Sequence, residues 1–296
     1  MQTFYSKLRV NFLKFRNGRW SFSFVEDERE ENGVVYQQFN NFPNKESYSD
    51  IKSISFLVFD DELKKVQRIP NFLNELPNLE VVSVPIAWLC SIKTPLNIKA
   101  ITLINTLRLQ DKYSWCEGLF LENLLYLEIP ELIKPFDIDF NNVPHLKWIK
   151  IDLKAEKKDT KLTQLAQLKN LKHLSFGQAK NFDVFMPFKD HQIESLELFA
   201  CKGKSFPIEN IQLLKSLKYI RINNISVEFD CSLILELPNL LEIELLNIKN
   251  VTNIEKLLEH KTLKSLVITD CKNPFKEVGK DIFKNKGYKL LRIDYA

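Results

Sequence analysis

The nine residues LPNLLEIEL at positions 237–245 decide the fold of this chain. Apolar side chains stand at the first, fourth, seventh and ninth places of this stretch, and the places between them vary. The same pattern recurs at intervals along the chain. The matching segments are LPNLEVVSV (76–84), LENLLYLEI (121–129), VPHLKWIKI (143–151), LKNLKHLSF (168–176) and LKSLKYIRI (214–222).

Shorter matches fill the intervals between these segments. They lie at 51–56, 98–103, 193–198, 263–268 and 288–293. The third apolar position of successive units then falls at 54, 82, 101, 127, 149, 174, 196, 220, 243, 266 and 291. The steps between these positions are 28, 19, 26, 22, 25, 22, 24, 23, 23 and 25 residues. Self-similarity at such a period indicates a stack of repeats, in which each unit packs only on its neighbours.

The pattern resembles the leucine-rich-repeat family, whose units of about 20–29 residues read L-x-x-L-x-L-x-x-N/C. The resemblance covers roughly residues 50–296, and only the step of 19 lies outside the family's range. Cys201 and Cys271 match the Asn or Cys position. Elsewhere that position holds Ala87, Thr106, Leu132, Lys154, Ala179, Ile225 or Ile248. The resemblance implies an α/β solenoid with parallel strands on the concave side and short helices or 3₁₀ segments on the convex side.

Each repeat combines two periodicities. Leu127 and Ile129 alternate with Tyr126 and Glu128, and a period of two predicts a strand with one buried face. The connecting segments carry apolar residues at helical spacing instead. Clear cases are 162–168, 208–217 and 254–258. We therefore expect strand, turn and short helix in each unit.

The expected organisation is one continuous array of about ten to eleven repeats at 51–296, preceded by a cap at 1–50. A cap is required because the open end of an array exposes its core. Residues 8–15 and 20–25 alternate as strands, Asn17-Gly18 is a hairpin signal, and 34–36 suggests a third strand. We therefore predict an N-terminal antiparallel β cap. At the other end, 288–295 predicts an edge strand, through which we consider a homodimer. The alternative is that the charged Lys289, Arg292 and Asp294 protect this edge from pairing.

Composition argues against several kinds of chemistry. The chain has 296 residues, 45% of them hydrophobic, and a net charge of +4 from 42 basic and 38 acidic residues. Lysines are interleaved with acids rather than clustered in a basic stripe, which argues against a nucleic-acid partner. The chain has only seven glycines, and it contains no Walker loop, GxSxG or GxGxxG motif. Its four histidines form no HExxH motif. We expect no enzyme activity, no metal site and no cofactor.

The cysteines and the apolar segments give an expectation about location. There are five cysteines, an odd number, and none is paired at CxxC spacing. This predicts the absence of a disulfide framework and a reducing compartment. The N-terminus has no apolar signal-like region, and no stretch approaches the roughly 18 apolar residues of a membrane helix. We expect a soluble cytoplasmic protein without a membrane partner.

The repeat phase also predicts which side chains leave the concave face. Near the centre of the array, the outward positions hold five aromatic or imidazole side chains and one arginine, types enriched at interface hot spots. The alternative is that strands favour aromatic residues, which merely cover their neighbours. We expect the aromatic side chains to be exposed and to form a binding surface. Its predicted residues are Tyr126, Glu128, Trp148, Lys150, His173, Glu197, Phe199, Tyr219, Arg221, Glu242 and Glu244.

The function predicted from these observations is non-enzymatic binding of a partner protein on the concave face. The Lys-, Asn-, Ile- and Phe-rich composition with few glycines suggests an AT-rich bacterial genome. In that setting the alternative is an immunity or inhibitor protein that neutralises a cognate toxin or enzyme. An enzyme accessory and a nucleic-acid binder are less favoured.

Overall fold

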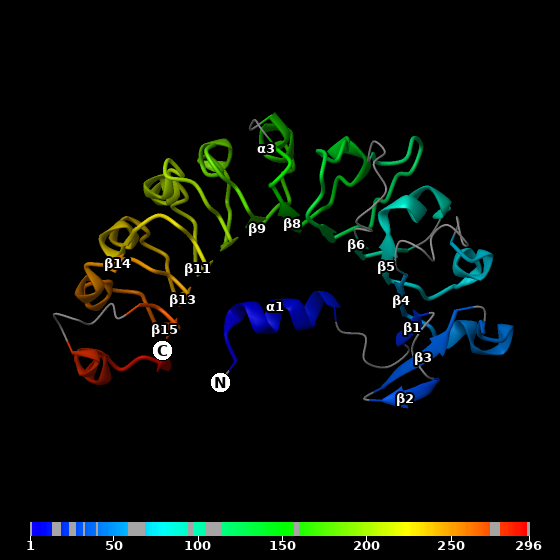
Figure 1. The fold of residues 1–296 in the computed structure, drawn as a ribbon, viewed down its shortest axis with the longest axis horizontal. Coiled ribbons are helices and arrows are strands. Elements are labelled where there is room, and N and C mark those ends of the chain that lie inside the picture. The colour runs from blue at the N-terminus through cyan, green and yellow to red at the C-terminus, as the bar shows by residue number, and fades with distance from the viewer. Residues whose placement is uncertain are drawn as a thin grey trace. The chain divides into compact units, whose positions relative to one another are not determined.

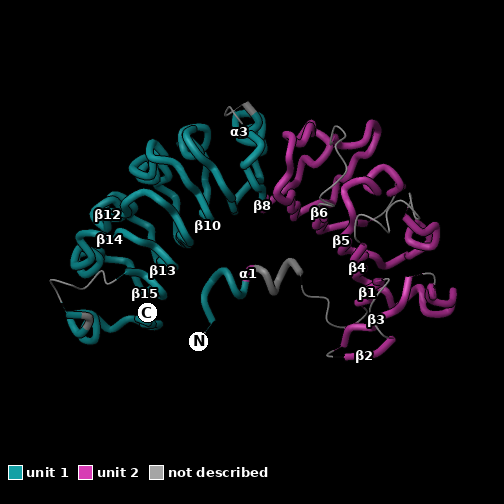
Figure 2. The backbone as a smooth tube through the Cα atoms, in the orientation of Figure 1, with its two compact units in different colours: residues 1–7, 150–296 teal, residues 8–149 magenta. Residues whose placement is uncertain are grey.

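A computed structural model describes most of the chain. The described residues are 2–13, 19–23, 28–31, 33–39, 41–58, 69–93, 97–104, 114–156, 160–272 and 279–294. They form two compact units, coloured separately in Figure 2. Unit 1 contains residues 1–7 and 150–296, and unit 2 contains residues 8–149. Helix α1 (Phe4–Leu13) and strand β8 (Trp148–Asp152) each cross the division.

Unit 2 is a stack of strands in the hydrogen-bonded order β2-β3-β1-β4-β5-β6-β7. Strand β2 pairs antiparallel with β3, and the pairings from β3 through β1 to β7 are parallel. The strands are β1 (Arg19–Ser23), β2 (Arg29–Glu31), β3 (Val34–Gln38), β4 (Ser53–Leu57), β5 (Val81–Pro85), β6 (Ala100–Ile104) and β7 (Tyr126–Ile129). The 3₁₀ helices are η1 (Lys45–Asp50), η2 (Asn71–Glu75), η3 (Ile86–Ser91) and η4 (Phe140–Asn142).

Unit 1 continues the same architecture in the order β8-β9-β10-β11-β13-β15-β16. Its strands line one side, and its helical segments line the other (Figure 1). The main strands are β9 (His173–Gly177), β10 (Ser195–Phe199), β11 (Tyr219–Asn223), β13 (Glu242–Leu246), β15 (Ser265–Thr269) and β16 (Leu290–Asp294), with a small parallel pair of β12 (Phe229–Asp230) and β14 (Val251–Thr252). The helical segments are α3 (Thr160–Leu165), η5 (Met186–Phe188), η6 (Ile208–Leu213), η7 (Cys231–Glu236), η8 (Ile254–Leu258) and η9 (Lys280–Lys286).

Strand register confirms the repeat phase. In unit 2, Ile54 pairs with Val82, Val82 with Ile101, and Ile101 with Leu127, so the short step of 19 residues leaves the register intact. In unit 1, one column contains Leu174, Leu196, Ile220, Ile243, Leu266 and Leu291. All of these side chains except Leu291 are fully buried. Burying a Leu or Ile side chain contributes about 1.5–3 kcal/mol, so this column forms the spine of the core. The helical connections predicted at 162–168, 208–217 and 254–258 are confirmed as α3, η6 and η8.

A left-handed residue follows each central strand of unit 1. These residues have φ values from 51° to 55°, and each donates its backbone N–H to the last residue of the next strand. They are Gln178, Ala200, Asn224, Asn247 and Asp270. The residue after each one points into the core. Those residues are Ala179, Cys201, Ile225, Ile248 and Cys271, all buried. The backbone therefore closes the turn, and an apolar residue suffices where the family pattern has Asn.

The N-terminal cap contains an antiparallel pair, β2 with β3, as the antiparallel prediction requires, but two of the predicted strands differ from what was expected. The strand predicted at 8–15 is wrong, because residues through Leu13 belong to α1; the hairpin at Asn17-Gly18 lies outside the described residues. The strand predicted at 20–25 is confirmed for its described part as β1, and the third strand is confirmed as β3. Strand β1, however, pairs parallel with both β3 and β4, and Phe22 lies directly beside Phe56 in the core. Strand β1 thus extends the repeat stack itself.

The expectation that the cysteines form no disulfide is wrong for one pair. Cys90 and Cys116 are bonded, with their Cα atoms 5.2 Å apart, and the two residues are 26 positions apart in sequence. They lie in the connections after β5 and β6, and stacking of consecutive repeats brings such connections together. CxxC spacing could not reveal this pair. Cys201, Cys231 and Cys271 are free and buried. Within the part of the chain that the structure describes, no helix has the length and apolar character needed to span a bilayer.

Candidate functional site

Eight of the predicted binding residues lie together on the strand face of unit 1. Parallel register places the side chains in rows across β9, β10, β11 and β13. The first row is His173, Ser195, Tyr219 and Glu242. The second is Ser175, Glu197, Arg221 and Glu244, and the third is Gly177, Phe199, Asn223 and Leu246. We call these three rows, with Lys150 of β8, the strand-face patch.

The N-terminal segment covers the first row of the strand-face patch. The Phe4 ring stacks on the Tyr219 ring, with centroids 3.6 Å apart and planes 6° from parallel. It also lies 5.9 Å from the imidazole of His173. The Tyr5 hydroxyl donates to the backbone oxygen of Tyr219 at 3.2 Å, and the Phe4 backbone N–H donates to Glu242 Oε1 at 2.7 Å. Positions that the sequence assigns to a partner are therefore occupied by residues of the same chain.

Acidic side chains are buried beneath this segment. Glu197, Glu242 and Glu244 are at most 7% exposed. The Arg221 guanidinium lies between two of them, with Nη1 3.7 Å from Glu197 Oε1 and Nε 3.9 Å from Glu244 Oε2. Two of the three buried carboxylates thus share one arginine, and an ionised carboxylate loses hydration on burial.

The buried groups titrate away from their usual ranges. Burial raises the pKa of Glu244, and Arg221 partly offsets the rise. Burial also raises the pKa of Glu242, offset in part by the Phe4 N–H and by the charge of Lys7. The Tyr5 pKa is raised well above its usual value, chiefly by burial and next by the negative Glu197. The patch therefore contains acidic side chains that are shielded from water where the N-terminal segment covers them.

The third row depends on a glycine. A Cβ atom added to Gly177 would lie 2.2 Å from two carbons of the Phe199 ring, so the ring occupies the space that any other side chain would fill. Lys150 Nζ lies 5.6 Å from the centroid of the same ring, within range of a cation–π contact. Phe199 is half-buried here. The glycine fixes where this predicted binding residue lies.

The remaining three predicted residues, Tyr126, Glu128 and Trp148, lie in unit 2, and the exposure of the two aromatic ones was predicted wrongly. Tyr126 and Trp148 are each only 1% exposed, and their ring centroids are 4.6 Å apart. The Tyr126 hydroxyl donates to Glu128 Oε2 at 2.7 Å. The prediction failed because outward orientation from a strand does not ensure exposure: these two rings pack against each other. His173 and Tyr219 are likewise only partly exposed.

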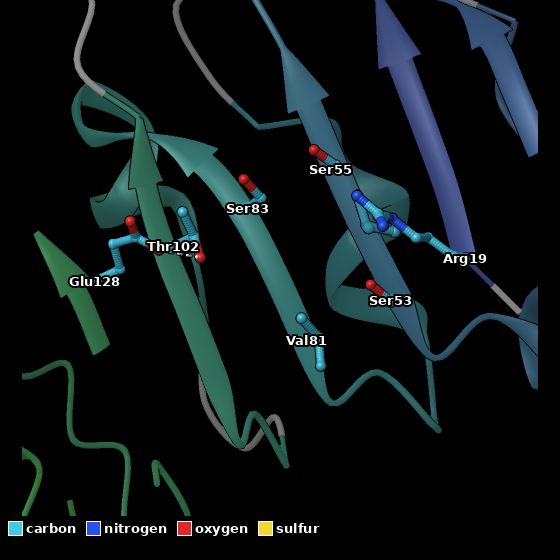
Figure 3. A pocket seen from close by; sticks show the side chains of 8 residues that line it. Arg19, Ser53, Ser55, Val81, Ser83, Thr102 and Glu128 are labelled. Atoms are coloured by element: carbon cyan, nitrogen blue, oxygen red, sulfur yellow. Dashed lines mark hydrogen bonds between the residues drawn. The ribbon is translucent and has the colours of Figure 1, made fainter. Parts of the chain in front are cut away.

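Unit 2 also has a hollow of about 250 Å³ on its strand face. Figure 3 shows hydroxyl side chains from neighbouring strands on its floor, with Arg19 at one end and Glu128 at the other. The floor hydroxyls belong to Ser53, Ser55, Ser83 and Thr102. Thr102 donates to Glu128 Oε2 at 3.5 Å, so this carboxylate is already engaged from two sides.

Nucleophilic and metal chemistry finds little support in the described residues. Burial raises the pKa of the Cys201 thiol to about 12, so it stays protonated at neutral pH. Its thiol points to the backbone oxygens of Phe176 and Phe199. Within the described ranges, no three His, Cys, Asp or Glu side chains converge as metal ligands.

Sequence reasoning missed Phe4 and Tyr5 as parts of the site. The available signal was helical: Tyr5, Leu8 and Phe12 are spaced at i, i+3 and i+7. Leu8, Val10 and Phe12 also alternate, and the strand reading used that alternation. Nothing in the sequence indicates that these residues contact a strand more than 200 positions away.

Comparison with known proteins supports the fold. No protein-family model and no curated protein sequence matches this chain. A solved leucine-rich-repeat chain of the Toll–Spatzle complex from Drosophila is similar in fold, with a TM-score of 0.52 and 16% identity over 82% of this chain. This chain spans 36% of the length of that one. An internalin from Listeria monocytogenes gives a TM-score of 0.39 and 17% identity, covering 79% of this chain and 69% of the internalin. With the parallel stack of strands, the first likeness shows a leucine-rich-repeat solenoid fold.

Proposed function

We propose that this chain is a non-enzymatic binding module that holds a partner protein on the strand-face patch. The observation that supports it most is the row of Tyr219, His173 and Glu242, which already binds a helical segment by ring stacking and a carboxylate hydrogen bond. Protein binding is also what the Toll–Spatzle complex represents for the chain of similar fold. Tyr126, Glu128 and Trp148 belong to the proposal as well, although two of them are buried.

Charge supports a partner with a basic surface. Glu197, Glu242 and Glu244 give the patch an acidic character, and Arg221 neutralises only part of it. Complementary charge steers association and excludes partners of the same sign. A nucleic-acid phosphate backbone would be repelled here, so a protein is the favoured ligand.

Affinity capture from the native host, with variant proteins, tests this proposal. Tyr219→Ala and Lys150→Glu should each reduce capture at least tenfold, because one removes the stacking ring and the other reverses a charge beside Phe199. Lys169→Glu, which makes the same charge change at an exposed position between α3 and β9, is the matched control. Trp148→Ala is unsuitable because Trp148 is buried. Capture of the partner by Tyr219→Ala and Lys150→Glu at the wild-type level, as in the Lys169→Glu control, would refute a site on this patch.

The second candidate is a bacterial immunity or inhibitor protein that uses the same patch to block a toxin or enzyme. It is motivated by the amino-acid composition, which suggests an AT-rich bacterial genome, and by the acidic side chains of the patch, which suit a basic target. Co-expression with the protein encoded by a neighbouring gene should rescue growth if that protein is the toxin. Absence of both a toxic neighbour and rescue would remove this candidate.

Cytoplasmic location stays a prediction, and the Cys90–Cys116 bond counts against it, because disulfides persist mainly in oxidising compartments. Thiol trapping in acid-quenched cells decides the matter: a reduced pair supports the cytoplasm, and an oxidised pair refutes it.

We also keep the proposed homodimer through the C-terminal edge strand. Strand β16 ends the hydrogen-bonded order of unit 1. Light scattering at micromolar concentration should then give twice the chain mass. A monomer at all concentrations would refute the dimer.

A further inference from the structure

The N-terminal segment, residues 3–7, is bound to the strand-face patch in the way a ligand would be. The stack of Phe4 on Tyr219 is close and nearly parallel, and Tyr5 is 1% exposed. Phe4 and Tyr5 also meet edge to face, with centroids 5.5 Å apart and planes 82° from parallel. Two adjacent aromatic side chains therefore contact the patch, Phe4 by stacking on the Tyr219 ring and Tyr5 by burial and a hydrogen bond to the Tyr219 backbone.

The backbone of the segment adds a polar contact that depends on helix geometry. The first N–H groups of an α-helix lack partners within the helix, and its N-terminus carries partial positive charge. The Phe4 N–H is such a group, and Glu242 Oε1 accepts from it at 2.7 Å. Lys7, one turn further along α1, lies near enough to lower the pKa of Glu242 by its charge. The patch thus recognises the start of a helix as well as its side chains.

The patch residues that make these contacts belong to separate repeats. Glu242 lies on β13, Tyr219 on β11 and His173 on β9, while the segment itself contributes no strand to the stack. A second helix start with the same features would find the same rings and carboxylate if residues 3–7 moved away.

We propose that the strand-face patch is a docking site for the start of an amphipathic helix carrying two adjacent aromatic residues followed by a basic residue, and that residues 3–7 are its resident occupant, which a partner's helix must displace. This inference rests on the proposed function, because it names the chemistry of the partner and how access to the same site is controlled.

Tethering predicts how strongly the occupant competes. A segment joined to the chain that holds its own site acts at an effective concentration of about millimolar. A free peptide at micromolar concentration should therefore bind the wild-type chain poorly. A variant whose own segment docks weakly should bind the same peptide at least tenfold more tightly.

The test uses the full chain and a fluorescein-labelled peptide with the sequence of residues 1–13, followed by fluorescence anisotropy. Phe4→Ala in the chain removes the stacked ring from the occupant and leaves the patch unchanged. We expect it to lower the Kd of the peptide at least tenfold relative to the wild type. Ser6→Ala is the matched control, since Ser6 is exposed and its side chain hydrogen-bonds to Thr3 of the same segment, and it should bind like the wild type. Equal affinity of wild type and Phe4→Ala, or no binding to either, would overturn the proposal.

Two further variants locate the bound peptide. Glu242→Gln added to Phe4→Ala removes the acceptor charge and should weaken the peptide severalfold, and Tyr219→Ala added to Phe4→Ala should abolish binding. Undiminished binding in both double variants would place the peptide elsewhere and overturn the proposal. Tyr219→Ala alters a strand and can prevent folding. In that case the Glu242→Gln double variant alone tests where the peptide binds.

A purely structural role for the segment gives a different result. If residues 3–7 are an inseparable part of the core, Phe4→Ala will lower the urea midpoint of the whole chain, and the peptide will neither bind nor restore it. The proposed function fails separately, through unchanged partner capture by Tyr219→Ala and Lys150→Glu. If those variants lose partner capture but Phe4→Ala does not bind the peptide more tightly, the proposed function stands. In that case only the proposal that residues 3–7 are a displaceable occupant is refuted.

Discussion

Gly177→Ala offers a sharp test of the strand-face patch. The added Cβ would lie 2.2 Å from Cε2 and Cζ of Phe199 and 2.9 Å from Oδ2 of Asp152. Carbon atoms in van der Waals contact stay about 3.5–4.0 Å apart, so the ring must move by roughly 1.3 Å or more. Asp152 also accepts hydrogen bonds from Gln178 and from the Lys154 backbone, which limits its retreat.

The expected magnitude combines two opposing effects. Overpacking of this kind costs about 1–3 kcal/mol. Replacing a strand glycine with alanine otherwise stabilises by about 0.5–1 kcal/mol, because glycine loses more conformational entropy on folding. Gly177→Ala should therefore lower the free energy of unfolding by about 1–2 kcal/mol.

A double-mutant cycle with urea unfolding, followed by tryptophan fluorescence, isolates the clash. In a Phe199→Ala background the ring is gone and only the 2.9 Å approach to Asp152 Oδ2 remains, so Gly177→Ala should cost at least about 1 kcal/mol less than in the wild type. The coupling energy between the two sites should then exceed about 1 kcal/mol. An equal loss in both backgrounds, or a loss below about 0.5 kcal/mol in the wild-type background, would refute the placement of the Phe199 ring over Gly177.

Three more predictions concern titration, the disulfide and the turns. Burial raises the pKa of Glu244 above its usual 4.5, so its contribution to stability is present below about pH 4.5 and is lost as the pH rises through the folded value. Urea midpoints from pH 4 to 7 should fall less in Glu244→Gln, which retains Glu242 with its raised pKa, than in the wild type, and parallel curves would contradict this. Reducing Cys90–Cys116 opens a loop of 26 residues and should lower the free energy of unfolding by about 3 kcal/mol. Alkylation of the unfolded chain before reduction should leave two of the five cysteines unmodified. Five reactive thiols in the unfolded, unreduced chain would exclude the bond. Ala200 has φ 52°, where asparagine is better tolerated, so Ala200→Asn should raise the free energy of unfolding by about 0.5–1 kcal/mol; a loss would argue against this turn geometry.

The periodic part of the fold could be predicted from sequence because repetition averages out local ambiguity. A single nonapeptide such as 237–245 is compatible with many structures, but the column that includes Ile101 and Ile243 is in phase with every neighbouring unit. Parallel stacking turns that phase into register, so the buried column and the outward rows followed directly.

The N-terminal segment could not be predicted because it occurs once. Between residues 4 and 13, the apolar side chains fit a helix and a strand almost equally well, and no second copy breaks the tie. Its docking on Tyr219 joins positions more than 200 residues apart. Local patterns carry no information about such a contact, and the exposure of Tyr219 and His173 was overestimated for that reason.

The disulfide was missed for a related reason. Cys90 and Cys116 lie in connections of different lengths, so their spacing matches no motif. They come together because the repeats before them are stacked.

The constancy of the register has a consequence for how such a surface can change. Repeat lengths from 19 to 28 residues are absorbed in the connections, while the rows on the strand side keep the roughly 4.8 Å pitch of hydrogen-bonded strands. The strand face of each unit is therefore a regular array of outward-facing positions. A substitution at one of these positions does not require a change in the connections behind the strands. Proteins with this fold can therefore change single outward-facing residues, or exchange whole repeats, while the remaining rows of the strand face stay in register.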